Sequence, residues 1–150
     1  MNIQGLLHEQ SIMIPLDASD KESCIRAMID GLEKAGCIGD KAAYLDAVLK
    51  REQTGSTGIG FGVAIPHGKS AGVTKPGLAF AKLAKPLDWQ SLDGNPVSIV
   101  FMIAVPEAAA GNEHLQILIA LSRKLIDEQF RESLLSVTEP QQLTAILQNI

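Results

Sequence analysis

The most restrictive feature of the sequence is the segment VSIVFMIAV at residues 97–105, which is almost continuously apolar and ends at Pro106. A strand with both faces buried reads as an unbroken apolar run, because neither set of alternating side chains meets water. The segment LAFAKL at 78–83 alternates, as a half-buried strand does, and SIMIPL at 11–16 predicts another short strand. Residues 97–105 are therefore predicted to form the central strand of a sheet.

Two helices are expected before this strand. The first carries apolar side chains on one face, namely Ile25, Met28, Ile29, Leu32 and Ala35. Ser19 and Glu22 have the spacing of a capping box at its start, and Gly36 closes it. Asp40 is the expected cap of the second helix, which carries Tyr44, Ala47 and Val48 on one face and ends near 51–52.

Three helices are expected after the central strand. Asn112 is the expected cap of EHLQILIALSRKL, which is apolar around much of its circumference and is therefore predicted to be buried. DEQFRESLLS forms the next helix, and the last begins at Thr138 with Pro140 in its first turn. Strands interspersed with helices predict an α/β fold: a single domain over 1–150 with a mixed β-sheet of about five strands flanked by α-helices.

Composition narrows the class of protein. At 150 residues, 46% hydrophobic and 20% charged, the chain is an ordinary globular sequence, and its net charge of −4 offers no basic surface for nucleic acid. No segment approaches the roughly 18 apolar residues of a membrane span, so no membrane insertion is expected. Cys24 and Cys37 lack metal-type spacing and are predicted to be reduced core thiols. With no signal peptide visible, a cytoplasmic protein is expected.

The stretch GSTGIGFGVAIPHGKS at 55–70 is rich in glycine around His67. A P-loop would need glycine where Val63 stands, although Gly68, Lys69 and Ser70 supply its ending. The dinucleotide fingerprint G-x-G-x-x-G fails at the same position. Nucleotide binding is therefore disfavoured, and it would show as ATP affinity that depends on the lysine and serine.

Two interpretations of the glycines stay open. In one, they are turn or bulge residues with unusual φ, and the PHG segment ends a strand. In the other, their N–H groups face a common point and bind an anion together with the hydroxyls of Ser56 and Thr57 and the backbone of Gly58. Arg51, at the end of the preceding helix, can add a guanidinium to the same point.

His67 beside such donors suits nucleophilic chemistry on phosphorus. An imidazole with an ordinary pKa of about 6.5 is largely neutral at physiological pH and offers a lone pair without a separate base. His114 is expected in the first turn of the helix after Asn112, where the helix dipole disfavours a cation, so it can donate an N–H to a phosphoryl group. It can equally satisfy a nearby carbonyl. His8 has no such neighbours and is expected at the surface.

Four segments together resemble the fructose/mannitol-type enzyme IIA domains of the bacterial phosphoenolpyruvate-dependent sugar phosphotransferase system. They are KRE at a helix end, TGIGFGVAIPHG, the turn PLDW before a long apolar strand, and GNEHLQILIALSRKL. The resemblance extends over essentially the whole chain. It implies a mixed sheet flanked by helices and an IIA type-2 phosphocarrier without metal or other cofactor.

The resemblance also implies roles for individual residues. His67 would accept a phosphoryl group at Nε2 from the carrier HPr and pass it to a cysteine of a IIB domain, which acts with a membrane IIC component. Arg51 would clamp the phosphoryl oxygens, and His114 would stabilise the phosphorylated ring or the transition state. Docking of both partners predicts an apolar rim that includes Phe61, Val63 and residues 106–113. The alternative is a regulatory, nitrogen-type IIA module whose phosphorylation state controls binding to a target protein. The sequence does not identify the sugar.

Overall fold

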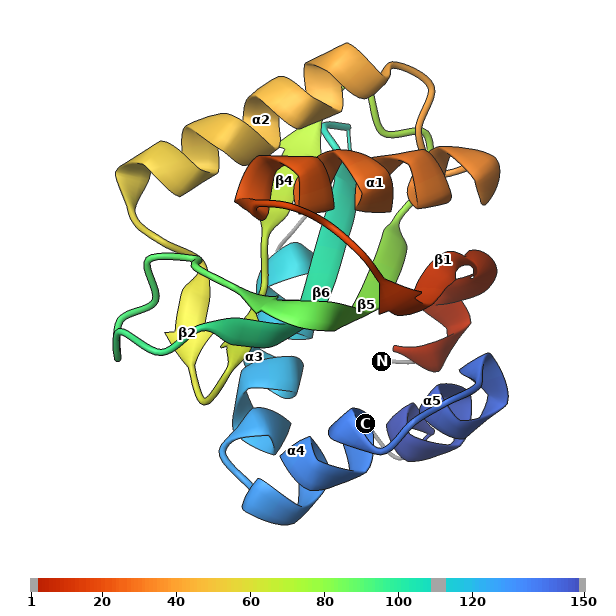
Figure 1. The fold of residues 1–150 in the computed structure, drawn as a ribbon. Coiled ribbons are helices and arrows are strands. Elements are labelled where there is room, and N and C mark those ends of the chain that lie inside the picture. The colour runs from red at the N-terminus through yellow and green to blue at the C-terminus, as the bar shows by residue number, and fades with distance from the viewer. Residues whose placement is uncertain (1–2, 109–112, 149–150) are drawn as a thin grey trace.

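The strands of the computed structural model, which describes residues 3–108 and 113–148, form a mixed sheet in the order β1-β5-β6-β3-β2 (Figure 1). A further strand, β4, also pairs with β6. The strands are β1 (Leu7–Leu16), β2 (Gly58–Gly60), β3 (Val63–Ala64), β4 (His67–Ser70), β5 (Gly77–Leu87) and β6 (Val97–Pro106). β5 and β2 run antiparallel to their neighbours β6 and β3, whereas β1 is parallel to β5, and β3 and β4 are parallel to β6.

Helices cover both faces of this sheet, as Figure 1 shows. After the short 3-10 helix η1 (Gln4–Leu6), the α-helices are α1 (Lys21–Lys34), α2 (Lys41–Thr54), α3 (Glu113–Leu125), α4 (Glu128–Leu135) and α5 (Pro140–Leu147). α1 packs on β1 and β5, and α2 packs on β4. On the other face, α3 and α4 pack on β6 and α5 packs on β1. The predicted α/β fold with a mixed sheet is confirmed.

The surroundings of strand β6 account for the apolar run at 97–105. Its residues alternate between two core clusters: Val97, Val100, Met102 and Ala104 pack beneath α1 and α2, and Ile99, Phe101, Ile103 and Val105 pack above α3 to α5. All eight are at most 2% exposed. The prediction of a central strand at 97–105 is therefore confirmed, and β6 is the strand against which β3 and β4 are positioned.

The helix predictions hold in most details. The side chain of Asp40 accepts the N–H of Ala43 as the expected cap of α2, and Gly36 has a φ of 84° after α1. The cap of α1 is Asp20 rather than Ser19, with Ser23 as its reciprocal partner. Asn112 lies outside the described residues. No helix in the described ranges 3–108 and 113–148 combines the length and the apolar character needed to cross a bilayer.

Three expectations about burial and strand limits are corrected. β5 is buried along most of its length instead of being half-exposed, because helices cover both of its faces. α3 is not buried all round, since Leu115 and Ile119 are 43% and 50% exposed. The interpretation in which the PHG segment ends a strand is wrong, since His67 begins strand β4.

The two cysteines are free and buried, as predicted. Burial raises the pKa of the Cys24 thiol to about 12, which keeps it protonated and unreactive near neutral pH. Both residues belong to the core cluster beneath α1 and α2.

Candidate functional site

Part of the glycine-rich stretch forms a tight hairpin of β2 and β3. The two residues between the strands, Phe61 and Gly62, have φ values of 60° and 77°, as a two-residue type I′ turn requires. The left-handed conformation is unfavourable for a bulky residue such as Phe61. A hydrogen bond stabilises it, since Oδ2 of Asp93 accepts the N–H of Phe61 at 3.0 Å. Hydrogen bonds from the N–H groups of Asn95 and Phe61 hold the pKa of Asp93 below its usual value. The interpretation of Gly62 as a turn residue is thus confirmed.

The backbone on either side of His67 is fixed against β6. His67 pairs in register with Ile103, and the carbonyl of Pro66 accepts the N–H of Ile103 at 3.1 Å. The Tyr44 hydroxyl, fully buried on α2, donates to the carbonyl of Ile103 at 2.7 Å. Burial raises the pKa of Tyr44, so its hydroxyl keeps the proton that it donates.

Gly68 allows α2 to approach β4 closely. A Cβ atom added at this position would lie 3.3 Å from side-chain atoms of Ala47, Tyr44 and Val48. This spacing is tighter than an ordinary van der Waals contact. The close packing of α2 on β4 thus favours glycine at the position after the histidine.

The imidazole of the half-buried His67 has a defined tautomer. Its Nδ1 lies 2.9 Å from the carbonyl oxygen of Ile65. A carbonyl oxygen only accepts hydrogen bonds, so Nδ1 must carry the proton. In the neutral ring the lone pair is then on Nε2, which makes Nε2 the nucleophilic nitrogen.

Arg51 lies in the last turn of α2, where its guanidinium binds the end of its own helix. Nη1 donates to the carbonyl of Gly55 at 2.7 Å and to Oγ1 of Thr54 at 3.2 Å. Both bonds come from one nitrogen of a group that has five N–H donors. Its role as a phosphoryl clamp stays a prediction.

The donors of residues 56–58 have partners within the chain. Ser56 Oγ donates to the carbonyl of Trp89 at 2.6 Å and accepts the N–H of Gly58 at 3.0 Å. The hydroxyl of Thr57 donates to Oε2 of Glu52, and its N–H donates to Oε1 at 3.3 Å. These bonds give the loop its shape, while phosphate binding by Ser56, Thr57 and Gly58 stays a prediction.

The other predicted histidines occupy different positions. His114 is the second residue of α3, as expected, but its side chain lies outside the described residues. β6 ends at Pro106, three positions beyond Ile103, and α3 begins at Glu113. His8 lies within β1 and is half-buried rather than at the surface.

The sequence interpretation missed Glu52 and Lys21. Their atoms Oε1 and Nζ are 2.7 Å apart, and the Glu52 side chain is only 7% exposed. A signal was present: an acid in the last turn of a helix and a lysine in the first turn both oppose the helix dipole. Such placements indicate a specific partner.

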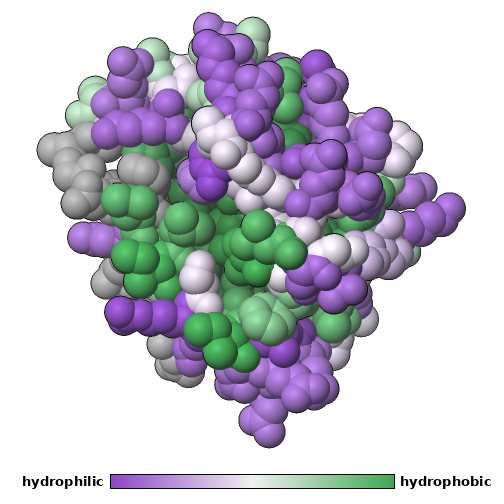
Figure 2. All heavy atoms as spheres, turned by 90° about the vertical axis from the view of Figure 1, so that its left-hand side faces the viewer, coloured by the Kyte–Doolittle hydropathy of each residue, from purple (hydrophilic) through white to green (hydrophobic). Residues whose placement is uncertain are grey.

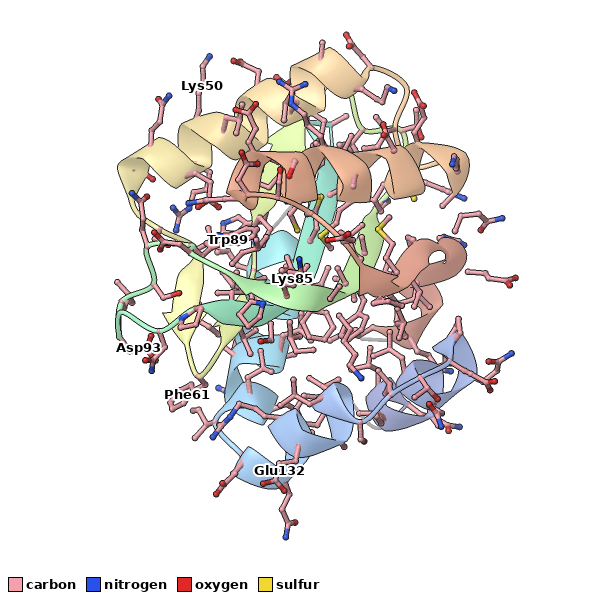
Figure 3. The ribbon with its side chains drawn as sticks, in the orientation of Figure 1. Lys50, Phe61, Lys85, Trp89, Asp93 and Glu132 are labelled. Carbon is pink, nitrogen blue, oxygen red and sulfur yellow. The ribbon has the colours of Figure 1, made fainter. Side chains whose placement is uncertain are left out.

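Exposed apolar side chains gather on the side of β2 and α3. They include Phe61, Leu115, Ile119 and Leu135, which are 56%, 43%, 50% and 46% exposed; we call these four residues the apolar patch. The expectation that Val63 is part of an exposed rim is wrong, because Val63 is 2% exposed and packs in the core. Figure 2, which faces this side, shows apolar side chains spread across the middle of the surface. In Figure 3, Phe61 lies at the tip of the β2–β3 hairpin, and Asp93 lies in the neighbouring loop.

The fold and the site together define an α/β domain with a mixed open sheet that presents an oriented histidine at the start of a strand. Residues 5–150 match the family model described as "Phosphoenolpyruvate-dependent sugar phosphotransferase system, EIIA 2". The chain belongs to this family, whose members are phosphotransfer proteins.

Two curated relatives illustrate the match. The chain is 44% identical over 135 residues to the PTS system fructose-specific EIIABC component of Bacillus subtilis, covering 90% of this chain and 21% of that longer protein. It is 45% identical over 130 residues to the PTS system fructose-specific EIIA component of Haloferax volcanii, covering 87% of this chain and 84% of the relative.

Two solved structures share the fold. The nitrogen regulatory protein IIA-Ntr of Neisseria meningitidis has a TM-score of 0.88 and 36% identity, covering 97% of this chain and 98% of the other. The mannitol IIA protein of Escherichia coli, solved in complex with phosphorylated enzyme IIB, has a TM-score of 0.81 and 26% identity. That match covers 97% of this chain and 100% of the other.

Proposed function

We propose that this chain is a phosphocarrier in which Nε2 of His67 accepts a phosphoryl group from phospho-HPr and passes it to a cysteine of a IIB domain, for uptake of a fructose/mannitol-type sugar. The observation that carries the proposal is the Nδ1–H bond from His67 to the carbonyl of Ile65, 2.9 Å long, which leaves the lone pair on Nε2. The two fructose-specific relatives support the sugar class.

The transfer needs no added base. The Nε2 lone pair forms a bond to phosphorus while the P–N bond of the donor phosphohistidine breaks, and its electron pair returns to the donor ring. The His67 ring then carries a positive charge, which the Ile65 carbonyl stabilises by accepting the Nδ1–H. In the second step the IIB thiolate bonds to phosphorus, and the electron pair of the Nε2–P bond returns to His67.

Electrostatic holding of the phosphoryl oxygens is the next part of the proposal. We assign Arg51 as the clamp, since its guanidinium has donors beyond Nη1 and loose, in-line phosphoryl transfer depends mainly on alignment and charge stabilisation. His114, in the first turn of α3, is assigned to the phosphorylated ring or the transition state. Ser56, Thr57 and Gly58 are also assigned to the phosphoryl oxygens.

The decisive test is loading of the protein with phosphate. We expect incubation with phosphoenolpyruvate, enzyme I and HPr to add the mass of one phosphoryl group, in an adduct that acid removes and base does not. Intact-mass measurement follows the adduct, and an established IIA domain treated in parallel shows that the donors are competent. Absence of the adduct with competent donors would overturn the proposal.

The apolar patch is the proposed docking surface for HPr and IIB. Ile119→Glu is expected to raise the KM for phospho-HPr about tenfold with little change in kcat. A charge in the core of an interface weakens binding, and a loss of about 1.4 kcal/mol of binding free energy weakens affinity tenfold. Initial rates of adduct formation over a range of HPr concentrations measure this.

The matched control for this variant is Gln141→Glu, which adds the same charge at an exposed position of α5. Its KM should stay within about twofold of the parent protein. Equal KM values for the two variants would remove the apolar patch from the docking surface. Normal kcat in both shows that the site itself is intact.

A regulatory role is the second candidate. It is favoured by the likeness to the nitrogen regulatory protein of Neisseria meningitidis, with 36% identity and a TM-score of 0.88. The two functions share loading of His67 and differ in the acceptor. Mixing the phosphorylated protein with fructose-type IIB distinguishes them: a transport component loses its phosphate to the IIB cysteine, whereas a regulator retains it.

A further inference from the structure

Lys21 and Glu52 occupy positions that the helix dipoles disfavour. Lys21 is the first residue of α1, and Glu52 lies in the last turn of α2, so each charge faces the unfavourable end of its own helix. The two charges compensate each other across 2.7 Å, and Lys21 Nζ also lies 5.5 Å from the centre of the Trp89 ring. A departure from local preference on both helices indicates that the pair serves something other than helix stability.

The Glu52 carboxylate holds the loop that precedes β2. Its Oε2 accepts the hydroxyl of Thr57, and its Oε1 accepts the Thr57 N–H at 3.3 Å. The Thr57 oxygen Oγ1 in turn accepts the indole N–H of Trp89 at 3.1 Å. Trp89 is fully buried, and in Figure 3 it lies between α1 and the sheet. Thr57 is therefore fixed through both its side chain and its backbone.

Thr57 is connected to the nucleophile through Ile65. The carbonyl of Thr57 accepts the N–H of Ile65 at 3.0 Å, and the carbonyl of Ile65 accepts the Nδ1–H of His67 at 2.9 Å. A continuous series of hydrogen bonds thus runs from Glu52 through Thr57 and Ile65 to the imidazole. In Thr57 and in Ile65, the bonded N–H and C=O groups belong to neighbouring peptide planes that share the Cα atom of that residue.

We propose that Glu52 is a positioning residue that fixes the tautomer and direction of the His67 ring through Thr57 and Ile65. Its use in phosphoryl transfer rests on the proposed function, but the tautomer itself does not. Lys21 compensates the buried charge of Glu52, and the indole N–H of Trp89 donates to the hydroxyl oxygen of Thr57. Small displacements of a reacting group reduce rates steeply, so loss of the Glu52 carboxylate should slow transfer although Glu52 itself is not assigned to the phosphoryl group.

The test compares Glu52→Gln with Asp46→Asn. Both remove one acid from α2, but Asp46 forms an exposed pair with Lys50, with side chains 63% and 72% exposed. An amide replaces one of the two acceptor oxygens by a donor, so Glu52→Gln cannot accept all the bonds that the carboxylate accepts. Long-range ¹H–¹⁵N NMR of the imidazole should show His67 as Nδ1–H in the parent protein and in Asp46→Asn. Glu52→Gln should lower that population.

Phosphorylation kinetics supply the second measurement. Loading of Glu52→Gln by phospho-HPr should be about 10- to 100-fold slower than loading of Asp46→Asn. An unchanged tautomer population in folded Glu52→Gln overturns the inference, whatever the rate. A parent protein that lacks the Nδ1–H tautomer overturns it as well. A third outcome separates the two proposals. If neither the parent protein nor the variants are phosphorylated, but Glu52→Gln still has a lower Nδ1–H population, the proposed function fails and the positioning role stands.

A second pair of variants covers poor folding of Glu52→Gln. Thr57→Val removes the hydroxyl between Glu52 and Trp89 at nearly constant volume, whereas Thr57→Ser retains it. The tautomer population should fall in the valine variant and be restored in the serine variant. The same population in both would contradict the proposal, because the series would not then pass through the hydroxyl.

Discussion

His67→Ala is expected to abolish the phosphoryl adduct completely, with no acid-labile mass increase after prolonged incubation with phosphoenolpyruvate, enzyme I and HPr. The physical reason is that the variant removes the atom that forms the bond: Nε2 is the ring nitrogen left with a lone pair when Nδ1 donates to the carbonyl of Ile65. Intact-mass measurement after defined incubation times gives the adduct fraction, and far-UV circular dichroism confirms the fold.

His8→Ala is the matched control, since it removes an imidazole from β1 at the opposite end of the strand order from β2. It should load to the same extent as the parent protein. A full adduct on His67→Ala would place the phosphoryl group elsewhere and contradict the assignment of the nucleophile. Loss of the adduct in both variants would indicate a general failure of docking or folding.

The large elements of the fold were predictable because their patterns arise from burial alone. An unbroken apolar run at 97–105 is what a strand covered on both faces must have, and β6 has that position. The cap of α1 was displaced by one residue, from Ser19 to Asp20, because adjacent polar residues have similar capping ability. Which of them has the extended backbone depends on how the chain leaves β1.

Exposure of α3 was not predictable from its composition. A helix that is apolar around its circumference is buried in the core or covered by a partner, and the two cases have the same sequence pattern. Leu115 and Ile119 are exposed within this chain. Composition therefore indicates how apolar the helix is, but not whether the surface that covers it belongs to the same chain.

The sequence suggests candidate residues for the site but not the contacts that they make. His67 stands out because glycines surround it, and the turn conformation of Gly62 follows from residue type. The partners of Ser56 and Thr57 include Trp89, more than thirty residues away in the chain, as the separations of 33 and 32 for these hydrogen bonds show. Local patterns cannot show such pairings, which depend on how the loop after β5 returns to the sheet.

Trp89→Ala is expected to lower the free energy of unfolding by about 3–5 kcal/mol, since truncating a fully buried tryptophan removes its transfer free energy and leaves a cavity. It also leaves the Thr57 hydroxyl without the indole donor. The chain contains one tryptophan, so its fluorescence disappears in the variant. Urea denaturation followed by far-UV circular dichroism measures both proteins by the same signal.

Trp89→Phe separates the two contributions to that loss. Phenylalanine keeps most of the buried ring but has no N–H, so this variant should lose about 1–2 kcal/mol through the unpaired acceptor at Thr57. The expected order of stability is parent protein, Trp89→Phe, then Trp89→Ala. An unchanged midpoint in Trp89→Phe would mean that the indole N–H does not stabilise the loop. Trp89 would then contribute through packing alone. The connection from Glu52 to His67 would pass through Thr57 without any contribution from the indole N–H.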